Sequence, residues 1–167
     1  MYVKISIRVR KLEELKEKIL FICLDEKLGE SVSKEFADNL SMHFANCREL
    51  IEYDLFNSQA VFSQCGEEYY LMRERKVAKM ACGYENSVMF ATYDIYHHSK
   101  EVFDKFATKI YIKIPEKQLS NEYTISKLNY TERDEELKAS ANFVVEVKRA
   151  NTKLILKEIY KILGGIK

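Results

Sequence analysis

The sequence predicts a single α+β domain, with helices packed on a mixed or antiparallel sheet. Strand-like and helix-like patterns interleave irregularly along the 167 residues, which is typical of that class. The length suits one domain spanning residues 1–167, and a single proline with five glycines leaves little material for linkers. Hydrophobic residues make up 47% of the chain and charged residues 32%, so a globular protein is expected rather than a disordered one.

Alternating or continuous apolar runs predict the strands. In residues 2–10 and 109–114, apolar and polar side chains alternate, which places one face of each strand in the core. Pro115 ends the second of these strands. Residues 19–24 are apolar throughout, and this run fits either a strand or the end of a helix. Further strands are expected over residues 59–64, 87–95 and 142–147, and near Tyr123.

Periodic apolar residues and capping side chains predict the helices. Gly29 interrupts the pattern, and Ser31 or Ser33 is expected to cap a long helix that runs to about Tyr53. One apolar stripe supports this long helix, formed by Phe36, Leu40, Phe44, Cys47 and Ile51. Other helices are expected over residues 11–18, over 67–81 with Gly83 as a left-handed cap, from Ser99 to Phe106, after Thr131, and from Asn151 to Gly164.

The charge balance excludes a globally basic nucleic-acid-binding protein. Lys and Arg number 27 against 26 Asp and Glu, which gives a formal net charge of +1. No apolar run approaches the roughly 20 residues that a membrane span needs. Residues 1–10 alternate charged and apolar side chains, unlike the core of a secretory signal. A cytoplasmic protein with no membrane partner is therefore expected.

No motif for catalysis, metal binding or cofactor binding stands out. The phosphate-binding loop, Gly-x-Gly-x-x-Gly, Gly-x-Ser-x-Gly and His-Glu-x-x-His patterns are all absent. A metal site formed by Cys65, Cys82 and His97 is conceivable, but its spacing matches no standard zinc module. We therefore expect no catalytic residues, no metal ion and no cofactor. The four cysteines are expected to be reduced, in buried positions.

Basic residues on two helices form the candidate binding surface. In residues 67–81, Arg75, Lys76 and Lys79 gather opposite the apolar arc, while Arg73 falls inside that arc and needs a carboxylate or an exposed edge. The last helix carries Lys153 and Lys157, with Lys148 and Arg149 just before it. If both faces lay on one side of the molecule, they would form a phosphate-binding surface. The alternative is that these are ordinary solvated helix faces.

The middle of the chain resembles a known family. The segments VFSQ, EEYYLMRERKVAKMACG and YENSVMFATYD are expected to form strand, helix, glycine and strand. This order is similar to the core of the small tRNA-binding accessory subunit of the KEOPS complex. The resemblance covers residues 61–106, and Arg75-Lys76-Val77 and Gly83 occupy the places of the family's Arg-hydrophobic pair and glycine. It implies a non-catalytic protein that binds tRNA and the kinase subunit of an RNA-modifying complex.

Three functions are therefore weighed from the sequence. The first is a non-catalytic module for RNA modification, with tRNA and a kinase subunit as partners. The second is a protein-interaction or inhibitor domain of immunity or anti-defence type, which would use the 11 tyrosines of the chain as contact residues. The third is an enzyme of unrecognised type, in which His97, His98 and Cys65 would be the first residues to test.

Overall fold

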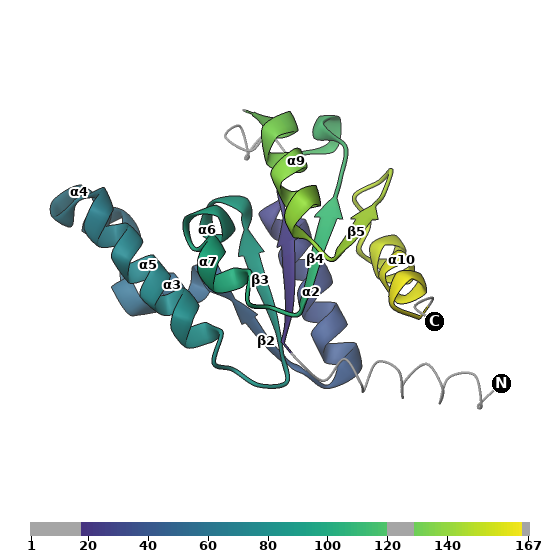
Figure 1. The fold of residues 1–167 in the computed structure, drawn as a ribbon, viewed down its shortest axis with the longest axis horizontal. Coiled ribbons are helices and arrows are strands. Elements are labelled where there is room, and N and C mark those ends of the chain that lie inside the picture. Colours follow the sequence, from purple (N-terminus) through teal and green to yellow (C-terminus); the bar gives the residue numbers. More distant parts are fainter. Residues whose placement is uncertain (1–17, 120–128, 165–167) are drawn as a thin grey trace.

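The computed structural model describes residues 18–119 and 129–164, which form one parallel five-stranded sheet covered by helices (Figure 1). The strand order is β2-β3-β1-β4-β5, and all four neighbouring pairs are parallel. The strands are β1 (Ile19–Cys23), β2 (His43–Asn46), β3 (Ser87–Thr92), β4 (Thr108–Lys113) and β5 (Phe143–Glu146).

The helices connect successive strands and return the chain to the same end of the sheet. They are α2 (Glu26–Leu40), α3 (Cys47–Leu55), α4 (Ser58–Cys65), α5 (Glu67–Ala81), α6 (Tyr93–His98), α7 (Lys100–Phe103), the short 3-10 helix η1 (Glu116–Gln118), α9 (Tyr130–Ser140) and α10 (Thr152–Gly164). Because every strand then enters from one side, the sheet is parallel. The predicted α+β class with a mixed or antiparallel sheet is therefore wrong, and the fold is α/β.

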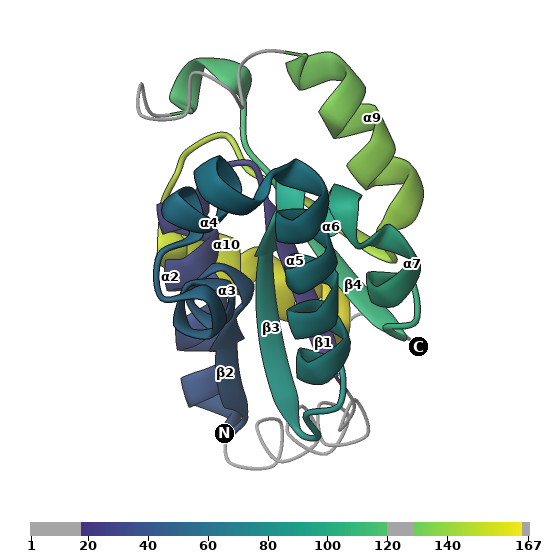
Figure 2. The ribbon, with the colours of Figure 1, turned by 90° about the vertical axis from the view of Figure 1, so that its left-hand side faces the viewer.

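Helices cover the two faces of the sheet in separate layers. Figure 2 shows α6 and α7 to the right of β3 and β1, and α2 to their left. Helix α10 packs against α2, where Tyr160 stacks on Phe36. Strand β1 is central, and all five of its residues, Ile19–Cys23, are buried. Burial on both faces explains why this strand reads as a continuous apolar run rather than an alternating one.

The long helix expected up to Tyr53 is three elements. Asp25, and not Ser31 or Ser33, caps α2, because its carboxylate accepts a hydrogen bond from the Leu28 amide at 3.0 Å. The helix ends at Ser41, whose backbone adopts the left-handed conformation with φ 53°. The apolar stripe from Phe36 to Ile51 is thus divided among α2, β2 and α3. The helical spacing of these residues is coincidental, because the strand β2 lies between the two helices.

Of the other local predictions, some are confirmed and others are wrong. The helix over residues 67–81 and the Asn151 cap are confirmed, since the Leu154 amide donates to the Asn151 side chain at 3.1 Å. The strand expected over 59–64 is wrong, because these residues lie in α4. Gly83 is not a left-handed cap: Gly66 is the glycine with positive φ among the described residues. The strands expected over 2–10 and near Tyr123 lie outside the described residues.

Gly29 is a packing residue inside α2 rather than a helix breaker. An added Cβ atom would lie 2.3 Å from the Phe90 ring and 2.7 Å from the Cys23 side chain. The helix therefore approaches β1 and β3 closely only because this position carries no side chain. Ser33 is buried one turn later and donates its hydroxyl to the Gly29 carbonyl at 2.6 Å.

No helix in the described ranges 18–119 and 129–164 is both long and apolar enough to cross a membrane.

Replacing Gly29 with valine is expected to destabilise the protein by roughly 1–3 kcal/mol, the usual cost of overpacking a core. Even Gly29→Ala is expected to destabilise it, although alanine normally stabilises a helix interior relative to glycine by about 0.5–1 kcal/mol. Urea unfolding measures both effects. Lys34→Ala, at an exposed position of the same helix, is the matched control and should change stability by less than ~0.5 kcal/mol. Stabilisation by Gly29→Ala would contradict the close packing.

Candidate functional site at the carboxyl edge of the sheet

The strand order creates a switch point between β1 and β3. From β1 the chain passes through α2 on one face of the sheet toward β2, whereas from β3 it passes through α6 and α7 on the other face toward β4 (Figures 1 and 2). In open α/β sheets, ligands bind in the crevice beyond the carboxyl ends of two such strands. The residues that follow Cys23 and Thr92 are therefore the first place to look for a site.

The turn after β1 is short and acidic. Only Leu24 and Asp25 separate β1 from α2, and Asp25 is buried while it caps the helix. Glu26 occupies the first turn of the same helix. A helix N-terminus usually attracts anions, and nucleotide-binding loops use it to hold phosphates on backbone amides. Here the chain's own carboxylate uses that position, in agreement with the absence of a glycine-rich phosphate loop from the sequence.

Arg48 links the ends of three strands at this edge. It lies in the first turn of α3, just after β2, where Asn46 caps the helix by accepting from the Arg48 amide at 3.0 Å. Its guanidinium Nη2 donates to the Thr92 hydroxyl at the end of β3, at 3.4 Å. Its Nε lies 2.8 Å from the Glu26 carboxylate after β1. One cation thus spans the switch point.

Tyr93, His97 and Glu136 form a hydrogen-bonded cluster beside Arg48's partner Thr92. The Tyr93 hydroxyl donates to Glu136 at 2.6 Å, and His97 Nδ1 lies 3.0 Å from the same carboxylate. The two rings stack with centroids 5.4 Å apart. Burial, together with the hydrogen bond to Glu136, raises the pKa of Tyr93 well above its ordinary value, so it acts as a donor.

Glu136 keeps its charge within this cluster. Burial alone would raise the pKa of the Glu136 carboxyl, but hydrogen bonds from Tyr93 and His97 outweigh it and lower that pKa. A carboxylate on Nδ1 fixes the histidine tautomer and leaves the other ring nitrogen to accept a proton. His97 is exposed, so the pair has the chemistry of a general base facing solvent.

Arg133 completes the site from α9. Its guanidinium lies over the Tyr93 ring at 4.5 Å and approaches Asp94 at 3.4 Å. Helix α9 is held in place by Asp134, a buried carboxylate that accepts from the Tyr111 hydroxyl at 2.9 Å and pairs with Lys138 at 2.6 Å. The hydrogen bond from Tyr111 on β4 to Asp134 therefore fixes the positions of Arg133 and Glu136 at the carboxyl edge of the sheet.

Both arginines leave a buried donor without a hydrogen bond. In the described residues, three buried side-chain polar atoms lack a hydrogen-bond partner, and two of them are Arg48 Nε and Arg133 Nη1; the third is Ser99 Oγ. The Arg48 Nε–Glu26 contact is close enough for an ion pair but does not have hydrogen-bond geometry. Buried donors usually have a partner in folded proteins, and the Glu26 carboxylate already faces Arg48 Nε, so in the described part of the chain Arg133 Nη1 is the buried guanidinium nitrogen that makes no contact with an acid.

A second histidine pair joins α6 to α5. His98 Nδ1 lies 3.0 Å from Glu74, a carboxylate that is only 2% exposed. The hydrogen bond that His98 donates to the Glu74 carboxylate raises the pKa of His98 despite partial burial. Glu74, Asp94 and Glu67 are the acids that favour the charged ring. Helix α6 is therefore held between two carboxylates, Glu136 on α9 and Glu74 on α5.

The basic residues predicted on α5 lie on its outer surface. Arg73 instead faces α3 and pairs with a carboxylate, as its position predicts: its Nη2 and Nε lie 2.7 Å and 3.1 Å from Asp54. Arg75 donates weakly to the His98 carbonyl at 3.5 Å. Lys76 and Lys79 are exposed, and they line a shallow hollow with Arg75.

The structure does not bring the two basic faces together. Lys153 and Lys157 are exposed on α10, in a shallow hollow that also contains residues of α2. Lys148 and Arg149 are exposed before that helix. Figure 1 shows α5 and α10 at opposite ends of the long axis of the molecule. No observation tests whether any of these residues binds nucleic acid.

The remaining sequence candidates are spread out. Cys65 is exposed in α4, while Cys82 is half-buried after α5. Within residues 18–119 and 129–164, no group of three or more His, Cys, Asp or Glu side chains could hold a metal ion. Cys23 and Cys47 are buried free thiols. Arg48, Arg133 and Glu136 were not foreseen, because they converge only when α3 and α9 meet the end of β3.

Comparison with solved structures identifies the fold as that of shikimate kinase. The chain is similar to shikimate kinase from Acinetobacter baumannii in complex with shikimate, with a TM-score of 0.73, 14% identity, and coverage of 90% of this chain and 94% of that one. It is similar to shikimate kinase from Bacteroides thetaiotaomicron with a TM-score of 0.73 and 14% identity, covering 89% and 98%. For shikimate kinase from Aquifex aeolicus the TM-score is 0.67 and the identity 19%, covering 89% and 96%.

Sequence comparison adds no family. No protein-family model matches the chain, and no curated protein matches it. At identities below one fifth, the solved structures establish the fold alone.

These matches correct the functional expectations. The resemblance to the KEOPS accessory subunit is wrong, because about nine tenths of the chain follows the shikimate kinase fold. The tRNA-modification role fails with it, as does the interaction or inhibitor alternative. The expectation that the chain is not an enzyme is contradicted as well, because the matching structures are kinases. The local pattern over residues 61–106 misled because many sheets contain such a helix and strand.

Replacing Asp25 with alanine is expected to destabilise the protein by about 0.5–2 kcal/mol, because α2 loses its N-cap. Asp25→Asn should be nearly neutral, since asparagine caps as well as aspartate does. Chemical denaturation of both variants measures the difference. Equal destabilisation by the two changes would show that the charge, and not the cap, is what matters at this helix end.

The His98–Glu74 pair predicts a stability that falls as the pH rises. Because the folded-state pKa of His98 is raised above its ordinary value of 6.5, its contribution is fully present below that value and is lost as pH rises through the folded pKa. The wild type should therefore exceed His98→Gln in stability most at low pH. The difference is expected on the order of 1 kcal/mol or less, since the ring is partly exposed.

Urea unfolding at a series of pH values measures this loss. His43→Gln is the matched control, because His43 is exposed on β2 and has no carboxylate partner in the described residues. A His98→Gln difference that stays constant with pH would contradict the assignment.

Proposed function

We propose that this chain is a small-molecule-binding protein of the kinase class, which holds a ligand bearing carboxylate or hydroxyl groups between Arg48 and Arg133. The observation that carries the proposal is that two arginines, each with one buried nitrogen that makes no hydrogen bond, contact Thr92 and Tyr93 at the switch point of a parallel sheet. Arginine forks match carboxylates and hydroxylated acids better than lysines do. One of the matching structures holds shikimate, which supports a hydroxylated acid as the class of ligand.

The chemistry proposed for the class is phosphoryl transfer to a ligand hydroxyl. In such a reaction the protein chiefly positions the two reactants and stabilises negative charge on the transferred group. Arg48 and Arg133 would supply positive charge, and His97, oriented by Glu136 at 3.0 Å, would accept the proton from the hydroxyl. The proton would pass to the free ring nitrogen, since Nδ1 already faces the carboxylate.

The phosphoryl donor must be held differently from that of a nucleotide kinase with a glycine-rich loop. Asp25 and Glu26 place two carboxylates at the N-terminus of α2, where such a loop would hold phosphates. The proposal therefore assigns ligand recognition to the arginine pair and does not assign nucleotide binding to α2.

Shikimate, a carboxylate with three hydroxyl groups, is the first probe, and binding is measured by isothermal titration calorimetry. Arg133→Met, which keeps the packing over Tyr93 but removes the donors, should weaken binding by roughly 10- to 150-fold, the loss of a hydrogen bond to a charged group worth about 1.5–3 kcal/mol. Arg149→Met, on an exposed arginine, is the matched control and should bind like the wild type.

Phosphoryl transfer is followed in the same preparations with ATP and Mg²⁺. A panel of hydroxylated acids other than shikimate extends the titration. Failure of every member to bind, or binding that survives both Arg48→Met and Arg133→Met, would contradict the proposal.

A further inference from the structure

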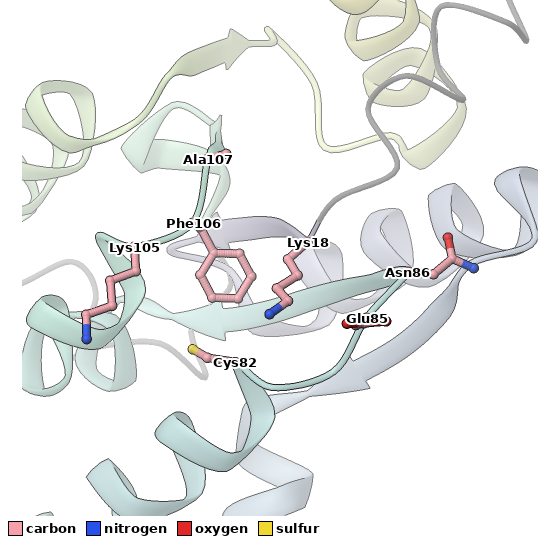
Figure 3. A pocket seen from close by; sticks show the side chains of 7 residues that line it. All are labelled: Lys18, Cys82, Glu85, Asn86, Lys105, Phe106 and Ala107. Atoms are coloured by element: carbon pink, nitrogen blue, oxygen red, sulfur yellow. The ribbon is translucent and has the colours of Figure 1, made fainter.

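A separate cavity lies at the opposite, amino-terminal edge of the sheet. Its volume is about 650 Å³, which is within the usual size of small-molecule pockets. Its described lining comes from the residue before β1, the turn between α5 and β3, and the segment before β4 (Figure 3). These residues are Lys18, Cys82, Glu85, Asn86, Lys105, Phe106 and Ala107. None of them belongs to the carboxyl-edge site.

The walls of this cavity are held by backbone hydrogen bonds. The Gly83 and Tyr84 amides donate back to Met80 and Ala81, each at 3.0 Å, which fixes the end of α5. On the other wall, the Phe106 amide donates to the Phe103 carbonyl at 3.0 Å, and the Phe106 ring is buried. The cavity is thus formed before any ligand arrives, which lowers the entropy cost of binding.

The charge in this cavity is positive. Lys18 and Lys105 contribute two ammonium groups against the single carboxylate of Glu85. Among the described residues, neither lysine lies within salt-bridge distance of an acid. Both ammonium groups act on the thiol of Cys82, whose pKa they lower, although burial has the larger effect and raises it to about 11. Figure 3 shows the Lys18 amine, the Cys82 sulfur and the Phe106 ring around one space.

We propose that this cavity binds a small organic dianion, such as a phosphate monoester, with its acid group between Lys18 and Lys105 and its carbon portion against Phe106 and Ala107. Two lysines act as point charges for phosphate or carboxylate oxygens. Among the described lining residues, Glu85 leaves a net charge of +1, so a dianion is attracted and a cation is not. The Phe106 ring and Ala107 provide the apolar surface that distinguishes an organic ligand from an inorganic ion.

Cys82 provides a reporter inside the cavity, and Cys65 provides an internal reference. Iodoacetamide alkylates the thiolate sulfur: the S–C bond forms, iodide leaves, and the thiol proton has passed to solvent. A bound dianion neutralises the two lysines and covers the sulfur, and both effects slow alkylation. Cys65 is exposed on α4 and lies outside the cavity. Its rate should stay unchanged.

The experiment measures alkylation of both cysteines in the full chain at pH 9, by mass spectrometry of peptides, with phenyl phosphate against sodium chloride at equal ionic strength. We expect phenyl phosphate at millimolar concentration to slow Cys82 several-fold relative to Cys65. Inorganic phosphate should protect less, because it lacks the carbon portion. The double variant Lys18→Gln, Lys105→Gln should lose the protection.

The matched control is Lys76→Gln, Lys79→Gln, which removes the same charge from exposed positions of α5 and should keep the protection. Melting temperatures confirm that each variant is folded, and the single substitutions Lys18→Gln and Lys105→Gln replace the double variant if it is not. The proposal is overturned if phenyl phosphate fails to protect Cys82, protects Cys65 equally, or protects the double variant as well as the wild type.

Discussion

The fold depends on burying β1 on both faces of the sheet. All five residues of this strand are removed from solvent, so helices must cover it from both sides. Crossover connections between parallel strands are almost always right-handed, and therefore opposite faces can be covered only when the chain leaves β1 and β3 in opposite directions. The crevice between these strands follows from that requirement. The position of the candidate site thus follows from covering β1 on both faces, while its chemistry comes from the residues at the strand ends.

The sequence predicted elements correctly where the local signal was strong. The helix over 67–81 follows from its apolar periodicity, without a capping side chain at its start, and the last helix follows from the Asn151 cap. The run 19–24 stayed ambiguous because a strand buried on both faces has no alternation. The predicted fold class was wrong in part because β2 was missed. This strand has only four residues, too few to interrupt the helical spacing of the apolar residues around it. The left-handed residue that ends α2 is Ser41, and a serine carries little signal for that conformation.

The candidate site could not be found from sequence. Arg48 follows a strand that had been assigned to a helix, and Arg133 lies in a region with weak periodicity. Their common feature is a donor that is buried and unsatisfied, and that property exists only in three dimensions. The basic residues of α5 and α10 were visible in the sequence because they lie on regular helix faces, but regular exposed faces are what solvated helices also show. The sequence indicated His97 as a conceivable metal ligand and a residue to test, but not its contact with Glu136, which reaches it from another helix.

The lengths of the strands have a consequence for solubility. Both outer strands of the sheet, β2 and β5, have four residues, whereas the inner strands β3 and β4 have six. A sheet margin with free backbone groups can recruit another chain and start fibrous assembly, and short outer strands reduce that hazard. Lengthening β5 beyond Glu146 with β-branched residues would extend that template, so engineered versions of this protein are best kept short at both margins.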